Sequence, residues 1–197
     1  MKAFKFLSPL IFFVFLSPTL QAQEFQSDKN CLAYHVEKTM FLFKDVVVWG
    51  TSCEVTPKVT PAAGGVVAMV EFPFNSIDSK EKDRDEDMHN DYLFTDKYPT
   101  ISYTSALIPT SDLMDLKTGK EIEMKGNLTI MALTSEVTFT LKLVDGHLMG
   151  TMKDSVQRLG VKAPKVMGGM MVKVHDPLEI KFDFLVALVP GAMAALR

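Results

Sequence analysis

The feature that most constrains the fold of this chain is a strict alternation of apolar and polar side chains in two segments. One segment covers residues 137–143 and has apolar side chains at Val137, Phe139, Leu141 and Leu143. The other covers residues 178–184 and has them at Leu178, Ile180, Phe182 and Phe184. Successive side chains of a β-strand point to opposite faces, so each segment is expected to form a strand with one buried and one solvated face.

Less regular stretches of the same kind recur along the chain and add six further candidate strands: 31–38, 40–54, 65–74, 100–108, 122–131 and 147–152. Turn sequences such as Asp145-Gly146 separate several of them. Seven or eight short antiparallel strands indicate an all-β barrel or sandwich. The densely charged stretch 79–90 is expected to be an exposed loop or a short helix, and no repeat or linker calls for a second domain.

The first 22 residues are predicted to be a secretory signal peptide that precedes a domain covering residues 23–197. Lys2 and Lys5 are followed by an apolar run from Phe6 to Leu16, and Ala22 offers a small residue at the cleavage position. A membrane anchor is the alternative, but it needs about 20 apolar residues and this run is shorter. We therefore expect a periplasmic or secreted protein without a transmembrane span in the mature chain.

Export changes the interpretation of Cys31 and Cys53, the two cysteines of the chain. Disulfides persist in oxidising compartments, so the two are expected to pair. Two buried free thiols are the alternative.

The formal charge of −3 and the scattered Lys and Arg residues form no basic surface that would suit a nucleic-acid backbone, so DNA and RNA are not expected partners. A homodimer is left open.

The search for catalytic or metal-binding motifs gives little. The most tempting site is a run of oxygen and imidazole groups at alternate positions: Asp83, Asp85, Asp87, His89 and Asp91. As a calcium loop this run fails, because Met88 stands where the sharp turn needs glycine and Phe94 stands where a bidentate Glu is needed. No HExxH, GxSxG or glycine-rich phosphate motif is present. We expect no enzyme activity, no metal site and no cofactor.

Two blocks of sequence resemble the signature of the YceI-like family of secreted polyisoprenoid-binding proteins. The first begins at Arg84-Asp85 and Met88 and continues through Tyr92 to Lys97-Tyr98-Pro99 and an alternating strand that ends in Ser105. The second is Gly126-Asn-Leu128-Thr129, with Thr134 and Val137 beyond it. Their order and spacing agree with the family pattern from about Val66 to Leu143.

The resemblance implies a lipocalin-like antiparallel β-barrel of about eight strands around an elongated apolar cavity. It also implies an isoprenoid lipid or the tail of a quinone as the ligand. The mature chain keeps nine Phe and twelve Met, side chains that fit irregular apolar spaces. The same residues would also suit a filled core, so a structural or stress-related protein with a solid barrel remains an alternative. Another is a secreted enzyme that uses His35, His89 or His175 as a base.

Assigning the inner face of each strand gives the residues expected to line the cavity. These are Phe41, Phe43, Trp49, Phe72, Ile101, Tyr103, Leu128, Ile130, Phe139, Leu141, Phe182 and Phe184. A second set matches the family motif residue by residue: Arg84, Asp85, Tyr98, Pro99, Gly126, Leu128 and Thr129. For Arg84 and Asp85, a loop held by charge-assisted hydrogen bonds is favoured over contact with a ligand.

Overall fold

The computed structural model describes residue 25 and residues 28–40, 44–162 and 172–196. Its strands are β1 Cys31–Met40, β2 Lys44–Ser52, β3 Thr56–Ala62, β4 Gly65–Pro73, β5 Thr100–Ser105, β6 Ile108–Pro109, β7 Ile122–Ile130, β8 Leu133–Val144, β9 His147–Asp154 and β10 Val172–Leu185. Its helical segments are η1 Phe74–Ser76, α1 Lys82–Asp87, η2 Met88–Tyr92, α2 Thr110–Lys117, η4 Val186–Leu188 and α3 Ala192–Ala195. The protein is mostly β, as the alternation predicts.

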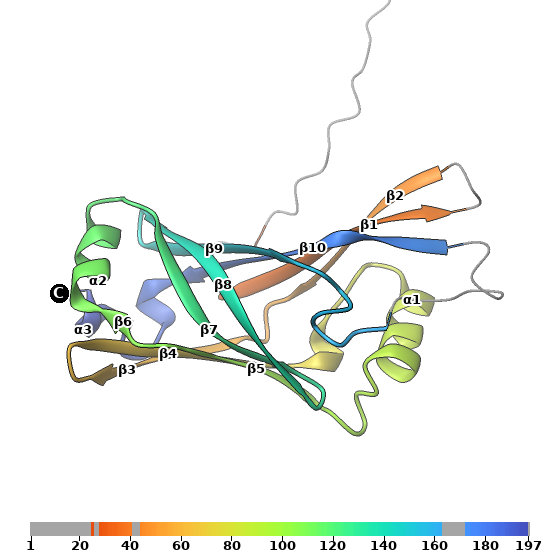
Figure 1. Cartoon of the computed structure of the whole chain (residues 1–197), viewed down its shortest axis with the longest axis horizontal. Helices are drawn as coiled ribbons and strands as arrows, with labels where there is room; N and C mark the ends of the chain where they lie inside the picture. Colours follow the sequence, from red (N-terminus) through yellow and green to blue (C-terminus); the bar gives the residue numbers. More distant parts are fainter. Residues whose placement is uncertain (1–24, 26–27, 41–43, 163–171, 197) are drawn as a thin grey trace, which may run out of the picture.

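All the described strands belong to one antiparallel sheet with the order β2-β1-β10-β9-β8-β7-β5-β4-β3, and β6 pairs with β4. The two strictly alternating segments, β8 and β10, flank β9. Along β7, buried and exposed residues alternate from Ile122 to Ile130. The sheet curls so that the buried residues of its strands meet in one interior (Figure 1).

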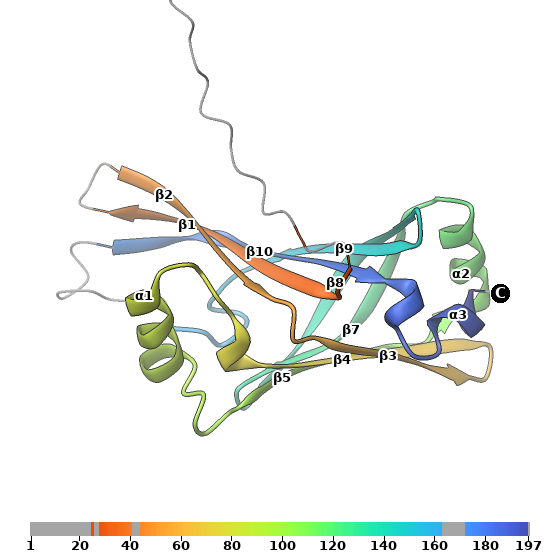
Figure 2. The ribbon, with the colours of Figure 1, turned by 180° about the vertical axis from the view of Figure 1, so that it is seen from behind.

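The expected closed barrel of about eight strands is not what the structure shows. Within the described residues no ladder joins β2 to β3, the two ends of the sheet, although they follow each other in the chain. Figures 1 and 2 show why: β2 lies toward the end of the molecule that holds α1, and β3 lies toward the opposite end. The bridge between Thr51 and Asp78 instead links β2 to the segment after β4.

Two elements have no counterpart in the expected pattern. Strand β3 contains Pro57 and Pro61 and little alternation, and it is tolerated because it lies at the edge of the sheet. Helix α2 follows Pro109 and buries Leu113 and Leu116 against the sheet interior. The charged stretch forms the short helix α1, continued by the π-helical turn η2, in agreement with one of its two expected forms.

The two ends of the sheet are covered differently. Helix α2 and the C-terminal segment, which comprises η4 and α3, lie at one end and add buried apolar residues to the core. Helix α1 covers the other end and has no buried residue. The apolar C-terminal tail thus packs on the sheet as a short end after the last strand.

The predicted disulfide between Cys31 and Cys53 is present, and Cys31 is fully buried. It connects the start of β1 to the short link between β2 and β3. In the chain-entropy model a cross-link of this loop length restricts the unfolded chain by about 3 kcal/mol. The bond therefore stabilises the fold at the place where the chain passes from one edge of the sheet to the other.

Candidate ligand-binding site

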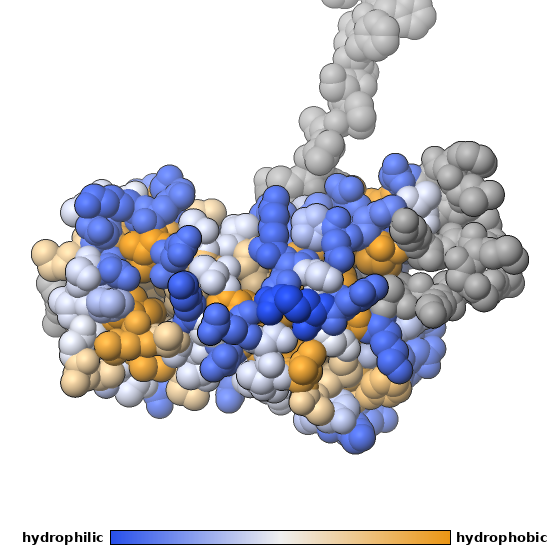
Figure 3. Space-filling model, in the orientation of Figure 1, coloured by the Kyte–Doolittle hydropathy of each residue, from blue (hydrophilic) through white to orange (hydrophobic). Residues whose placement is uncertain are grey.

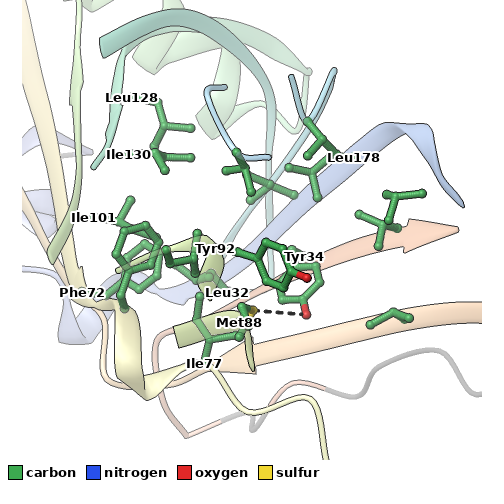
Figure 4. A pocket seen from close by; sticks show the side chains of 18 of the residues that line it. Leu32, Tyr34, Phe72, Ile77, Met88, Tyr92, Ile101, Leu128, Ile130 and Leu178 are labelled. Carbon is green, nitrogen blue, oxygen red and sulfur yellow. Dashed lines mark hydrogen bonds between the residues drawn. The ribbon is translucent and has the colours of Figure 1, made fainter. Parts of the chain in front are cut away.

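The interior of the sheet holds a cavity of about 680 Å³ on the side of α1. Strands β1, β2, β4, β5, β7, β8 and β10 form its walls, and α1 and η2 lie at its mouth. Figure 4 shows apolar side chains from these elements facing one common space. Its volume falls in the range of roughly 300–1,000 Å³ that is typical of small-molecule sites. The solid interior that was kept as an alternative is thus not found.

The walls follow the two-residue period of the strands. On β10 the lining side chains include Leu178, Ile180, Phe182 and Phe184, the apolar half of a strictly alternating segment. On β1 every second residue from Leu32 to Lys38 lines the cavity. Because alternation places one set of side chains on one face, the polar partners of these residues point outward.

Aromatic rings form part of the cavity wall. The ring of Phe139 meets Tyr103 edge-on at 5.4 Å, and Phe182 stacks on Phe184 at 4.4 Å between ring centroids. Burial raises the pKa of Tyr103. Its hydroxyl therefore stays protonated, and it donates to the carbonyl of Met124 at 3.4 Å. This part of the wall presents rings and no charge.

Two glycines leave the space that these rings occupy. A Cβ at Gly126 would come within 2.5 Å of the Tyr103 hydroxyl oxygen, and one at Gly150 would come within 2.2 Å of the Phe182 ring. Both glycines lie on strands next to the ring they accommodate. Gly126 of the second family block is therefore required for packing, since any side chain there would displace Tyr103.

The mouth of the cavity is charged. Three carboxylates (Glu81, Asp83 and Asp87) and three cations (Lys38, Arg84 and Lys162) lie among its lining residues. The carboxylates and Lys162 are exposed, whereas Lys38 and Arg84 are partly buried. Burial, helped by the positive charge of Arg84 and opposed by Glu81, lowers the pKa of Lys38. A ligand with a polar end would therefore keep that end at this mouth.

Tyr34 of β1 adds a hydroxyl group to the lining of the cavity. Burial raises the pKa of Tyr34 to about 12, with Arg84 opposing the shift and Asp85 adding to it. The hydroxyl is therefore protonated at neutral pH, and it donates to the sulfur of Met88 at 3.7 Å (Figure 4). Sulfur is a weak acceptor, so this contact leaves the hydroxyl able to serve a better one.

Arg84 and Asp85 hold the segment that leads into α1. The Arg84 side chain donates from Nε to Ser79 Oγ and from Nη2 to the Ser79 carbonyl, both at 2.7 Å. The Asp85 carboxylate accepts the Ser79 backbone N–H and hydroxyl. Ser79 is itself buried. This agrees with the loop-holding role favoured for the Arg-Asp pair, although Arg84 also borders the cavity.

The structure places eight of the twelve predicted lining residues at the cavity: Phe72, Ile101, Tyr103, Leu128, Ile130, Phe139, Phe182 and Phe184. That these side chains contact a ligand stays a prediction. Phe41 and Phe43 lie outside the described residues.

The remaining two of the twelve are corrected. Leu141 is buried but lies in the packed core away from the cavity. Trp49 lies on the outer face, where it stacks on His35 at 4.4 Å and lies under Lys181 Nζ at 5.4 Å. The alternation of β2 places Val48 inward, so the assignment of Trp49 was one residue out of phase.

The other motif residues have structural surroundings of their own. The Pro99 carbonyl accepts the N–H of Phe74 at 2.9 Å and so connects the loop before β5 to η1. Thr129 points outward, where its hydroxyl lies 2.9 Å from that of Thr134. Tyr98 lies in a separate groove under the Lys97 ammonium group, which is 5.1 Å from the ring centroid.

Several lining residues were not predicted, among them Tyr34, Val36, Met88, Tyr92 and Val174. The alternation of Leu32, Tyr34 and Val36 was the signal that could have found the first two. Met88 and Tyr92 come from η2, whose sequence shows no strand period. They line the cavity because the folded chain places η2 over the cavity mouth.

The four histidines do not line the cavity. His35 contacts Glu179 at 3.5 Å, His147 contacts Asp183 at 2.8 Å, and His175 lies 2.6 Å from the Thr39 hydroxyl. In the described part of the chain no three His, Cys, Asp or Glu side chains gather where a metal ion could be held. Nor does any helix there have the length and apolar character to cross a membrane.

Comparisons with known proteins agree with this geometry. A family model described as "YceI-like domain" matches residues 31–186. Among solved structures, BcnA of Burkholderia cenocepacia is 18% identical, with 76% of this chain and 94% of that chain covered and a TM-score of 0.55. A polyisoprenoid binding domain from Saccharophagus degradans, described as implicated in plant cell wall breakdown, is 12% identical over 77% of this chain and 91% of that chain, with a TM-score of 0.55. No curated protein matches the sequence.

Proposed function

Because the chain belongs to the YceI-like domain family, we propose that it binds the apolar tail of an isoprenoid lipid or quinone in its cavity. The observation that carries the proposal is the cavity of about 680 Å³ inside the sheet. Its walls are aliphatic and aromatic, and its charged groups lie at the mouth. The similar fold of the Saccharophagus degradans protein, whose description names polyisoprenoid binding, supports the same class of ligand.

Hydrophobic burial is sufficient for such binding. Each buried methylene contributes about 0.8 kcal/mol, so about ten carbons contribute on the order of 8 kcal/mol, near micromolar affinity before ordering costs. This needs no bond-making group. The protein therefore acts as a carrier or a sequestering protein for the lipid and not as an enzyme.

We propose the same cellular setting that the N-terminal sequence predicts. Residues 1–22 act as a signal peptide, and the domain of residues 23–197 works in the periplasm or outside the cell. Residues 1–24 lie outside the described part of the chain, so this proposal is supported by the sequence alone. Cleavage near Ala22 is checked by N-terminal sequencing of the protein secreted by its native host.

Equilibrium binding of radiolabelled geranylgeraniol tests the ligand proposal. The wild-type protein should bind it, and Leu128→Trp should weaken binding at least about tenfold, because the indole occupies space that the tail needs. Asn127→Trp is the matched control, since Asn127 is the neighbouring residue on β7 and is exposed. Thermal unfolding of both variants shows whether they are folded. A folded, lipid-free wild-type protein that binds no prenyl lipid would refute the proposal.

A further inference from the structure

A second groove of about 450 Å³ lies beside the cavity mouth, at the end of the molecule that holds α1. The loop between η2 and β5 forms one side, and the turn between β7 and β8 forms the other. Both figures of the ribbon show these two segments side by side (Figures 1 and 2). The groove shares Tyr92, Ile130 and Lys162 with the lipid cavity. It therefore adjoins that cavity, and we call it the portal groove.

The rim of the portal groove is apolar and exposed. Phe94 is 44% exposed on one side, and Leu133 is 43% exposed on the other. Apolar groups also reach the surface in separate patches elsewhere on the molecule (Figure 3). At the portal groove, however, they lie beside the cavity, with which the groove shares lining residues. Exposed apolar groups at the rim of a lipid cavity are expected where the lipid enters or leaves.

The backbone conformation at two residues of the portal groove is unusual for apolar side chains. Four non-glycine residues of the described chain have a positive φ, and Phe94 (49°) and Met131 (54°) are the two apolar ones. Both line the portal groove. A left-handed conformation costs free energy for such residues, and Asn or Gly would adopt it more easily. Met131 packs against the core, whereas Phe94 keeps 44% of its surface exposed, so burial offsets the strain at Phe94 only in part.

The charge of the portal groove selects its partner. Its charged lining residues are Lys97 and Lys162, both exposed cations, while the whole chain has a net charge of −3. Cations beside apolar side chains suit the surface of an anionic phospholipid bilayer, where the rings and aliphatic groups enter the interface and the ammonium groups meet phosphates. A prenyl tail is poorly soluble in water, and direct transfer between the bilayer and the cavity avoids exposing it to water.

We propose that the portal groove docks on an anionic phospholipid bilayer, with Phe94 and Leu133 in the interface, and passes the lipid tail between the bilayer and the cavity. This inference rests on the proposed function. It adds to it an interaction surface, the chemistry of the partner and a route for the ligand.

Extraction of fluorescently tagged geranylgeraniol from vesicles tests the inference. Donor vesicles contain phosphatidylcholine and phosphatidylglycerol, and transfer to the wild-type protein is followed over time. The rate should rise with vesicle concentration, and it should fall in pure phosphatidylcholine vesicles or high salt, which remove or screen the anionic charge. The double variant Phe94→Asn/Leu133→Thr should extract the probe about tenfold more slowly. Asn tolerates a positive φ, and Thr suits a strand, so both residues should be accommodated.

The matched control is Met114→Gln/Met193→Gln, which removes two exposed apolar side chains at the opposite end of the molecule. It should extract the probe at the wild-type rate. The Phe94/Leu133 variant should keep its equilibrium affinity for geranylgeraniol, so a wild-type protein that binds none refutes the proposed function instead.

Three results would overturn the portal inference. The first is an extraction rate that does not depend on vesicle concentration, because the lipid would then travel through water. The second is equal extraction by wild type and the Phe94/Leu133 variant. The third is a dimer in light scattering that dissociates with the variant, because the groove would then join two copies of the chain.

Discussion

The two halves of the sheet interior are built from the same kind of strand, yet one is filled and the other is hollow. At the end with α2 and α3, residues such as Leu116, Leu141 and Val189 pack into the core. At the end with α1, side chains of similar type surround a cavity of about 680 Å³. Strand composition therefore does not decide between a core and a pocket.

The elements that cover the two ends make the difference. Helix α2 contributes Leu113 and Leu116 to the interior, and the C-terminal segment contributes Val186 and Ala192. Helix α1, whose sequence is KDRDED, contributes no buried residue. Among the apolar side chains of this cover, Met88 and Tyr92 of η2 reach over the cavity, and they leave the space beneath it unfilled. The hollow half thus follows from a charged cover held by polar contacts.

The largest expected effect on stability comes from shortening a buried leucine, and it should differ between the filled and the hollow half. Leu141→Ala should lower the free energy of unfolding by about 3 kcal/mol, because it opens a new cavity in a filled core. Leu128→Ala should cost about half as much, because one side of Leu128 already faces empty space. Urea unfolding of the lipid-free variants measures both values. Equal losses would mean that the interior around Leu128 is as well packed as that around Leu141.

A smaller effect is expected at the polar contacts that hold α1. Arg84→Met removes two hydrogen bonds to Ser79 and should destabilise this end by about 1–2 kcal/mol. Hydrogen exchange should speed up in α1 while the α2 end stays protected. Lys82→Met is the control, since Lys82 makes only an exposed pair with Glu86 at 3.5 Å. Unchanged exchange in Arg84→Met would show that other contacts hold the helix.

The smallest effect concerns charges on the outer face behind the hollow half. Glu179 lies within 4 Å of two lysines, Lys181 at 3.1 Å and Lys153 at 3.7 Å, and of the His35 imidazole at 3.5 Å. Burial acts to raise the pKa of Glu179, but the hydrogen bond from Lys181 and the charges of Lys181, Lys153 and His35 lower it overall. Glu179→Gln should therefore destabilise the protein at pH 7 by less than about 1 kcal/mol, because solvent screens these pairs.

The difference in the free energy of unfolding between wild type and Glu179→Gln should depend on pH in a definite direction. A carboxyl group with a lowered pKa in the folded state stabilises the fold above its ordinary pKa of 4.5, and this contribution disappears as the pH falls through the folded-state value. Urea unfolding of wild type and Glu179→Gln should therefore differ at pH 7 and converge near pH 3. Glu71→Gln, at an exposed carboxylate of β4, is the control. A gap between Glu179→Gln and wild type that widens in acid would contradict the assignment.

Local pattern was enough to predict a large part of the site. Strict alternation in β8 and β10 predicted that Phe139, Phe182 and Phe184 line the cavity, and the inner-face assignment of β7 predicted the same for Leu128. Irregular alternation misled the assignment at Trp49, where a shift of one residue reverses the face. Leu141 fails for a different reason. Alternation correctly predicts that its side chain points inward, but it lies in the filled half of the interior.

The sequence by itself determined the antiparallel strands and the family, because alternation and motif spacing are local properties of the chain. It also predicted the pairing of Cys31 with Cys53, which the structure contains. Only the tertiary structure decided that the sheet stays open between β2 and β3 and that one half of its interior is hollow. It also decided that Phe94 and Leu133 meet across a groove. These features depend on how distant segments cover the sheet, and buried surface and empty space exist only once those segments have met.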